Sequence, residues 1–306
     1  LLAYGSYAEV KSSEETEEGI IRGKELYEKY LGFLKDKYIW EVKFITAGSF
    51  TYRTDDGIEA ALNAPVPADE QYTAMRKMYK SDITQQDTFK AMCDLCEERQ
   101  DCFAVLDLAK DIDPSSTLKQ FDNLDSSYAS SYAPWTYDKL YSGTLAWMPP
   151  SHCFLTNLAR SAQSKPIYYP PAGVNRMMCR RTAVTEYEIG AAIKDMWQQD
   201  AGHSVNPIMY IRGTGYTVYG QRTLVDLLSS AMGTTLKSVT VRFCSIEIKK
   251  AIFNTCINLT FEQNMLRTWN EFRSRVGSKL SEMKLNGALN DYHVIGTLLL
   301  IDEKPN

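Results

Sequence analysis

The sequence predicts an α/β (α+β) fold, in which a mixed β-sheet core is packed with helices. Residues 11–38, "KSSEETEEGIIRGKELYEKYLGFLKDKY", repeat apolar side chains at helical spacing, and residues 39–48, "IWEVKFITAG", alternate as a strand does. Residues 87–100, "DTFKAMCDLCEERQ", have a helical pattern, and residues 101–110, "DCFAVLDLAK", form a short apolar run typical of a strand buried on both faces. This alternation of helices and strands indicates an α/β fold.

We expect helices and strands to alternate along most of the chain. The first helix begins with a capping box formed by Ser12 and Glu15. The start of the last helix is open, because Thr260 and Gln263 also form a capping box, and we place it near Asn264. The predicted helices span about 12–37, 87–100, 246–257 and 264–284, with a short helix within 183–202, and the predicted strands span about 39–46, 102–108, 208–220 and 238–243.

The length of the chain fits either two domains or one large domain with insertions. We expect one core domain over residues 1–306, with a loop insertion at about 48–86, where turn-forming residues accumulate. A second irregular region is expected at about 113–180, which is rich in Ser, Tyr and Pro. The start, "LLAYGSYAEV", has no initiator methionine, so we expect the sequence to be a fragment of a longer chain.

The charge and hydropathy of the chain argue against two classes of function. Lys and Arg number 34 against 38 Asp and Glu, giving a net charge of −4, so the chain as a whole has no basic footprint for nucleic acid. No run of about 18 consecutive apolar residues predicts a membrane span. The 7 cysteines are an odd number and widely scattered, and we interpret them as reduced thiols.

The glycine-rich stretch at 209–224, "MYIRGTGYTVYGQRTL", raises the question of a phosphate loop. Gly215 and Gly220 have the outer spacing of G-x-x-x-x-G-K-[ST], but Gln221 and Arg222 follow in place of the lysine and the hydroxyl residue. The residues between the glycines are bulky and β-prone, whereas a phosphate nest needs several backbone amides turned inward. We therefore interpret the glycines as a turn or a close backbone approach. An α/β enzyme using the 213–220 loop, either a hydrolase or a nucleotide-dependent transferase, remains the alternative.

The other reactive side chains form no recognisable catalytic or metal motif. Cys93 and Cys96 make one C-x-x-C with Cys102 nearby, but no second pair completes a zinc site, and we expect small buried apolar residues. His152 and Cys153 are neighbours, which point to opposite sides on an extended segment. We therefore assign no catalytic, cofactor-binding or metal-binding residue and expect a protein that is not an enzyme.

Four sequence stretches between residues 126 and 289 carry distinctive motifs in a fixed order. They are "SSYASSYAPW" at 126–135, the Pro-Pro-Ser and Pro-Ala-Gly segments within 147–176, "NPIMYIRGTGYTVYGQRTL" at 206–224, and the Phe-Glu-Gln-Asn turn with its long following helix within 240–289. Together they resemble the contractile tail sheath proteins of myovirus-type bacteriophages, with Gln263 standing where the family has proline. The sheath-like motif residues are Pro149, Pro150, Ser151, Pro171, Ala172, Gly173, Asn206, Pro207, Gly213, Gly215, Gly220, Arg222, Thr223, Phe261, Glu262 and Asn264.

This resemblance implies a mechanical function that needs no active site and no cofactor. It implies hexameric rings of identical subunits stacked helically around a tail tube, with further contacts to baseplate proteins, none to nucleic acid directly and no membrane insertion. Contraction of such a sheath drives the tube through the host cell envelope. The expected location is the virion, with assembly in the host cytoplasm. The terminal arms of the family are not evident, so we expect this 306-residue form to assemble poorly. A tail-tube subunit is less favoured, because it would be more β-rich.

Overall fold

The computed structural model describes the chain as two compact units, which divide after Arg242. Unit 1 ends at Arg242 and unit 2 begins at Phe243. The described residues are 31–46, 85–108, 110, 112–199, 202–228 and 235–295. The expected loop insertion at 48–86 and most of the expected helix at 12–37 therefore lie outside the described residues.

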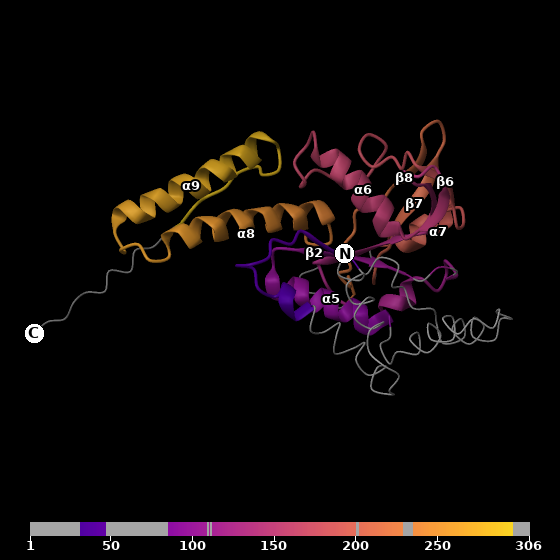
Figure 1. Ribbon diagram of the computed structural model, residues 1–306, viewed down its shortest axis with the longest axis horizontal. Helices are drawn as coiled ribbons and strands as arrows, with labels where there is room; N and C mark the ends of the chain where they lie inside the picture. Colours follow the sequence, from indigo (N-terminus) through magenta and orange to yellow (C-terminus); the bar gives the residue numbers. More distant parts are fainter. Residues whose placement is uncertain are drawn as a thin grey trace, which may run out of the picture. The chain divides into compact units, whose positions relative to one another are not determined.

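Unit 1 is built on a five-stranded mixed sheet with the strand order β1-β2-β3-β7-β8 (Figure 1). Its strands are β1 (Phe44–Thr46), β2 (Phe103–Asp107), β3 (Ala129–Ala133), β7 (Asn206–Ile211) and β8 (Gly215–Val218). The pairs β1–β2, β2–β3 and β3–β7 are parallel, and β7–β8 is an antiparallel hairpin. The mixed sheet with its helices confirms the predicted α/β fold.

Helices cover the central strands of this sheet from both sides. Every residue of β2 and β3 is buried, as expected for parallel strands with covered faces. Helix α5 (Gln85–Arg99) and helix α6 (Pro150–Ala162) lie on either side of β2 (Figure 1). The Phe154 ring of α6 stacks on the Tyr132 ring of β3, with a centroid distance of 4.1 Å. The core of unit 1 therefore sits where the apolar run "FAVLD" of β2 predicted it.

Residues 113–180 contain more regular structure than the sequence predicted. A second, three-stranded antiparallel sheet has the order β5-β4-β6, with strands β4 (Thr136–Lys139), β5 (Leu145–Met148) and β6 (Thr182–Thr185). Helix α6 also lies in this region. Its two prolines are tolerated because Pro149 and Pro150 occupy the N-cap and the first position, where a proline costs no helical hydrogen bond. The 3-10 turn η1 (Leu118–Phe121) precedes β3, and the short helix α7 (Ala191–Trp197) follows β6, within the predicted range.

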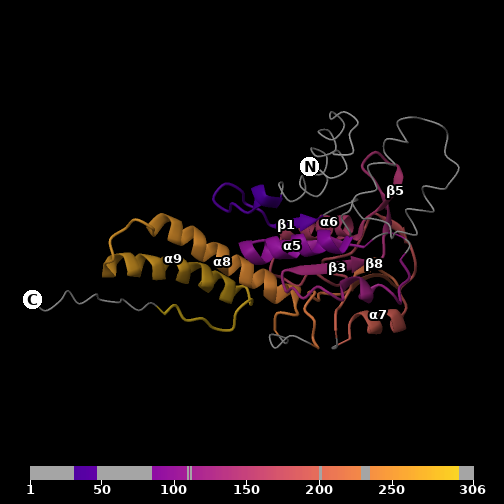
Figure 2. The ribbon, with the colours of Figure 1, turned by 90° about the horizontal axis from the view of Figure 1, so that it is seen from below.

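Unit 2 contains a pair of long helices, shown side by side in Figures 1 and 2. Helix α8 (Val239–Leu259) starts just before the boundary between the units, and helix α9 (Leu266–Leu285) buries Val276, Leu280 and Met283. The predicted strand at 238–243 is wrong, because residues 239–243 form the first turns of α8. The alternation of Val239, Thr240 and Val241 fits a strand, but the following residues continue the helical pattern. The predicted helices at 246–257 and 264–284 are confirmed.

The remaining helices and strands predicted for unit 1 are confirmed to different extents. The helix at 87–100 and the strand at 102–108 are confirmed by α5 and β2, and the strands within 208–220 by β7 and β8. Of the strand predicted at 39–46, only the last three residues pair as β1. No described helix is both long enough and apolar enough to cross a membrane.

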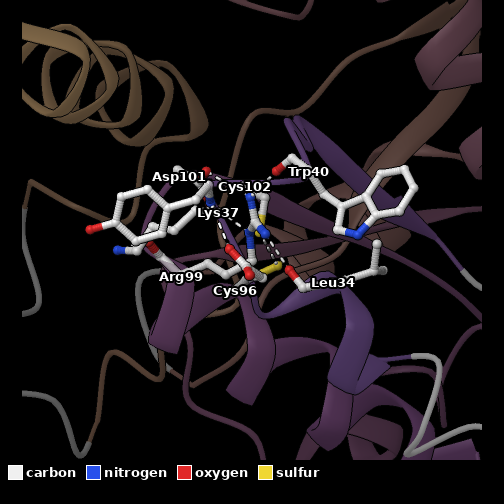
Figure 3. Close-up of polar contacts among 9 residues, drawn as sticks. Leu34, Lys37, Trp40, Cys96, Arg99, Asp101 and Cys102 are labelled. Atoms are coloured by element: carbon white, nitrogen blue, oxygen red, sulfur yellow. Dashed lines mark hydrogen bonds and ion pairs between the residues drawn. The ribbon is translucent and has the colours of Figure 1, made fainter. Parts of the chain in front are cut away.

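A buried arginine attaches the segment before β1 to the end of α5 (Figure 3). The Arg99 side chain forms two hydrogen bonds of 2.8 Å with the Asp101 carboxylate. The same guanidinium donates to the backbone carbonyl of Leu34 and, at 2.8 Å, to that of Trp40. Arg99 itself is 1% exposed, so nearly all of its donors are used inside the protein. This contact joins residues 34–40 to α5 and β2.

Candidate functional site: the motif segments of the sheet

The Pro-Pro-Ser segment begins α6 at the end of β2, next to a buried carboxylate. Pro149 and Pro150 start the helix, and the Ser151 backbone N–H donates a 2.7 Å hydrogen bond to Asp107 Oδ1. The Thr46 hydroxyl donates to Asp107 Oδ2 at 3.0 Å. Because the first backbone N–H groups of a helix lack partners within the helix, an acceptor such as Asp107 stabilises its start. The motif residue Ser151 therefore joins α6 to the sheet.

The Asp107 carboxyl is fully buried, and burial raises its pKa from 3.8 to about 6. The hydrogen bonds from Ser151 and Thr46 oppose this rise, because they favour the charged form. The positive charge on a protonated His152 would act in the same direction. Asp107 is the one charged residue at the end of an otherwise apolar strand, and this pattern is the signal by which the sequence could have indicated it.

The Asn-Pro-Ile segment uses its asparagine to join three parts of unit 1. Asn206 is fully buried, and its Nδ2 donates to the carbonyl of Ser131 at 3.1 Å and to that of Arg222 at 2.8 Å. Its Oδ1 accepts a 2.7 Å hydrogen bond from the Arg222 backbone N–H. Pro207 follows near the start of β7, where the missing N–H of proline is tolerated. The Asn206 amide thus connects β3, β7 and residue 222.

The glycines of 213–220 have two structural roles. Gly213 and Gly215 have φ values of +81° and +105° in the turn between β7 and β8, a region that favours glycine. Gly220 lies against β7, since an added Cβ would come within 2.7 Å of Asn206 Oδ1 and 3.0 Å of Asn206 Cα. The glycines therefore form a hairpin turn and a close backbone approach, and this geometry gives no support to a phosphate loop.

Two further motif segments contact the same part of unit 1. The Pro-Ala-Gly segment, with Pro171 and Ala172, ends at Gly173, whose φ is +88° and whose N–H donates to the Val218 carbonyl of β8 at 2.9 Å. Thr223 is buried, and its hydroxyl donates to the Leu236 carbonyl at 2.8 Å. Thus the structure brings the motif residues between 149 and 223 together around the sheet, where they make internal contacts.

The Phe-Glu-Gln-Asn motif lies in unit 2, in the loop between α8 and α9. Phe261 is fully exposed, and Glu262 and Asn264 are also exposed. The Asn264 side-chain oxygen accepts a 2.7 Å hydrogen bond from Trp269 Nε1 in the first turn of α9. Helix α9 begins at Leu266, so the start predicted near Asn264 is correct to within two residues and the Thr260 capping box does not start a helix.

The neighbouring residues His152 and Cys153 of unit 1 each contact a different side chain. His152 Nδ1 lies 3.4 Å from Asp138 Oδ2, an ion-pair distance at which the alignment makes no hydrogen bond. Cys153 contacts Cys179, and this contact, followed by burial, raises the pKa of the Cys153 thiol. A catalytic cysteine needs a lowered pKa, so His152 and Cys153 do not form a nucleophile and its base.

The C-x-x-C cysteines are also buried, as the sequence predicted. Cys93, Cys96 and Cys102 are each less than a twentieth exposed, and burial raises the pKa of Cys93 to about 12. Cys96 and Cys102 lie with their sulfur atoms 3.5 Å apart. Within the described ranges, no group of three or more His, Cys, Asp or Glu side chains could hold a metal ion.

Comparison with known proteins relates the sequence to one class. The chain is 26% identical over 190 residues to the tail sheath protein of Vibrio phage KVP40, which covers 60% of this chain and 27% of the relative. It is also 26% identical over 175 residues to the tail sheath protein of Enterobacteria phage T4, which covers 56% of this chain and 25% of the relative. The chain is similar in sequence to these two tail sheath proteins. No protein-family model matches it.

The fold is likewise similar to that of solved sheath and baseplate structures. The sheath complex of the extracellular contractile injection system PVC, in its contracted state, superposes with a TM-score of 0.57 at 17% identity, covering 83% of this chain and 78% of that one. The contracted baseplate of the anti-feeding prophage superposes with a TM-score of 0.54 at 18% identity, covering 69% of this chain and 53% of that one. The chain spans about a quarter of the length of the curated tail sheath proteins it matches, between 25% and 27%.

Proposed function

We propose that the chain is the core of a structural subunit in a phage contractile tail sheath. In this proposal, copies of the subunit surround the tail tube as a helical array of hexameric rings. Release from the extended array lets the subunits move outward into a shorter and wider one, which drives the tube through the host cell envelope. Stored conformational free energy supplies the work, and no catalytic residue or cofactor takes part.

The observation that carries this proposal is that the motif residues of unit 1 make contacts within the unit. Ser151, Asn206 and Gly220 make contacts inside the unit, and the geometry of each explains why that residue type stands there. A subunit that moves between two arrays must keep its own shape while its surroundings change, because rigid-body motion transmits the force. Buried and fully hydrogen-bonded polar groups supply such rigidity.

The sequence similarity to tail sheath proteins favours a tail sheath subunit over other kinds of rigid structural protein. Copies of the same chain are the first proposed partners, and tail tube and baseplate proteins are the others. The likeness of the fold to a solved baseplate component fits a subunit that also reaches the baseplate end of a tail. The proposed location is the tail of the virion, after assembly in the host cytoplasm. The glycine turn at 213–220 gives no support to the enzyme alternative.

Electron microscopy of purified protein tests this proposal. The gene product that contains residues 1–306 is purified and viewed by negative stain over a range of micromolar concentrations. We expect hollow tubes built of stacked six-fold rings. The Asn206→Ala variant, which removes hydrogen bonds inside unit 1, is expected to give few tubes. The Asn258→Ala variant, which changes an exposed residue, is expected to form them normally. Single compact particles at every concentration, or closed rings that never stack, would count against a sheath subunit.

A further inference from the structure

Two buried cysteines from segments far apart in the sequence meet in unit 1. Cys153 lies in the first turn of α6, and Cys179 lies in the segment between the Pro-Ala-Gly motif and β6. Their sulfur atoms are 2.6 Å apart, and the two side chains come from residues separated by 26 positions. Both residues are free thiols that are at most 5% exposed.

Neighbouring side chains hold the two sulfur atoms together. The Asn157 side-chain amide, one turn along α6, lies 3.4 Å from the Cys153 sulfur and 3.3 Å from the Cys179 sulfur. Arg160 donates to Asn157 Oδ1 at 2.6 Å and to the Met178 carbonyl at 2.7 Å, so it connects α6 to the residue before Cys179. The N–H of Cys179 donates to the Tyr216 carbonyl of β8 at 2.8 Å. Both cysteines are therefore presented to each other by a fixed framework.

We propose that Cys153 and Cys179 form an oxidative modification site, at which a small disulfide such as glutathione disulfide converts the two thiols into an intramolecular disulfide. This inference does not depend on the proposed function. A disulfide requires two cysteines whose side chains point at each other with little backbone movement, and this pair meets that condition. Cys96 and Cys102, with sulfur atoms 3.5 Å apart, are a looser pair in the same unit.

The reaction proceeds by two exchanges that balance atoms and electrons. One protein thiol loses its proton and attacks a sulfur of glutathione disulfide, giving a mixed disulfide and releasing one glutathione thiolate. The second protein thiol then loses its proton and attacks the protein sulfur of the mixed disulfide. The Cys153–Cys179 bond forms and the second glutathione leaves, so two protein thiols are oxidised and one glutathione disulfide is reduced to two thiols.

Cys179 is the expected entry point for the oxidant. Cys153 belongs to a helix of 13 residues, whereas Cys179 lies in a segment of turns and short bridges. Local opening of such a segment costs less free energy than opening a packed helix. The disulfide, once formed, joins α6 to the segment that carries Gly173. It therefore restrains two of the motif segments relative to each other.

Peptide mapping under non-reducing conditions tests the inference. The full chain is incubated with glutathione disulfide, unreacted thiols are blocked, and the digest is analysed by mass spectrometry. Exposed Cys256 serves as an internal control, because it takes up glutathione whenever the oxidant is active. We expect a peptide pair joined through Cys153 and Cys179, absent after treatment with reductant. Glutathionylated Cys256 without any Cys153–Cys179 peptide after prolonged incubation would overturn the proposal.

Thermal unfolding provides a second measurement, with the Cys153→Ala variant as the matched control. A disulfide that closes a loop of this length is expected to raise the Tm of unit 1 by roughly 5 to 10 °C on oxidation. The variant should show no such rise, and reductant should reverse the rise in the wild-type chain. An equal rise in Cys153→Ala would assign the effect to other cysteines and contradict the proposal.

Discussion

Asn206 and Arg222 bind each other through both ends of the asparagine amide. Asn206 Oδ1 accepts from the Arg222 N–H at 2.7 Å, and Asn206 Nδ2 donates to the Arg222 carbonyl at 2.8 Å. The amide is fully buried, and its second proton goes to Ser131 of β3. This relationship holds the chain after β8 against β7. Asn206 is buried and Arg222 is half-buried, so the asparagine amide has no ready substitute for these hydrogen bonds.

We predict that Asn206→Ala lowers the free energy of unfolding of unit 1 by about 3 kcal/mol, because it removes three hydrogen bonds, one of them to the buried carbonyl of Ser131. The exposed Asn258, which donates to Asn254 within α8, is the matched control, and Asn258→Ala should cost less than about 0.5 kcal/mol. Urea unfolding is followed by tryptophan fluorescence in a Trp269→Phe background, where the remaining tryptophans lie in unit 1. Equal costs for the two variants would show that the amide is not structurally important.

We predict that Gly220→Ala destabilises unit 1 by about 2 kcal/mol, because the new methyl group has to displace the Gln198 side chain and also presses against Asn206, including its backbone. Gly190 provides the control: its φ is −83° and nothing lies within 4 Å of an added Cβ. Gly190→Ala should therefore change the free energy of unfolding by no more than about 0.5 kcal/mol. Both are measured in the same urea experiment. A tolerated Gly220→Ala would mean that this glycine is needed for some other reason.

The raised pKa of Asp107 predicts a pH dependence of stability. The folded pKa of about 6 lies above the unfolded value near 3.8, so the folded state keeps its proton to a higher pH. The contribution of this group is fully present below about pH 4 and is lost as the pH rises through 6. Asp107→Asn removes this titration while keeping a hydrogen-bond acceptor for the Ser151 N–H.

The expected readout is the difference in free energy of unfolding between wild type and Asp107→Asn. As the pH rises from about 4 to 7, wild type should lose about 2.4 kcal/mol relative to the variant. Other titrating groups cancel in this difference, because they are common to both proteins. A difference that stays flat across this range would show that Asp107 is not the buried acid described here.

The ion pair between Arg99 and Asp101 predicts a loss of stability in an Arg99 variant that a second substitution at Asp101 partly reverses. Arg99→Met leaves the Asp101 carboxylate without its buried counter-charge and should destabilise unit 1 by about 3 to 5 kcal/mol. The double variant Arg99→Met with Asp101→Asn should recover part of this loss. Hydrogen exchange supplies a local readout, since residues 34–40 should exchange faster in both variants. Protection of 34–40 that is unchanged in Arg99→Met would contradict the attachment shown in Figure 3.

The sequence was most informative where one local pattern admitted one structure. The apolar run ending at Asp107 had to be a buried strand, and the spacing in 87–100 gave α5. It was misleading at 238–243, where a short β-branched run fits a strand and a helix equally, and the helical continuation decided the outcome. Helix α6 was missed because prolines dominate the composition around it, although a proline at the first helical position favours a helix.

The motif residues could be found from the sequence, but their contacts could not. Nothing local to Asn206 indicates that its amide meets Arg222, because that contact depends on how β7 and β8 pair. The same holds for Asp107 and Ser151, which are 44 residues apart. Gln221 and Arg222 after Gly220 argued against a phosphate loop, yet only the fold separates the turn glycines from Gly220, which allows a close approach.

Immunogold labelling of phage particles tests the central claim most directly. An antibody raised against residues 31–295 is applied to particles of the phage that the proposal implies, in the extended and the contracted state. The sheath assignment predicts gold along the whole side of the extended tail, and only over the shortened outer cylinder after contraction, with the protruding tube unlabelled. Gold on the exposed tube or on the capsid, or particles that bind no antibody in either state, would contradict it.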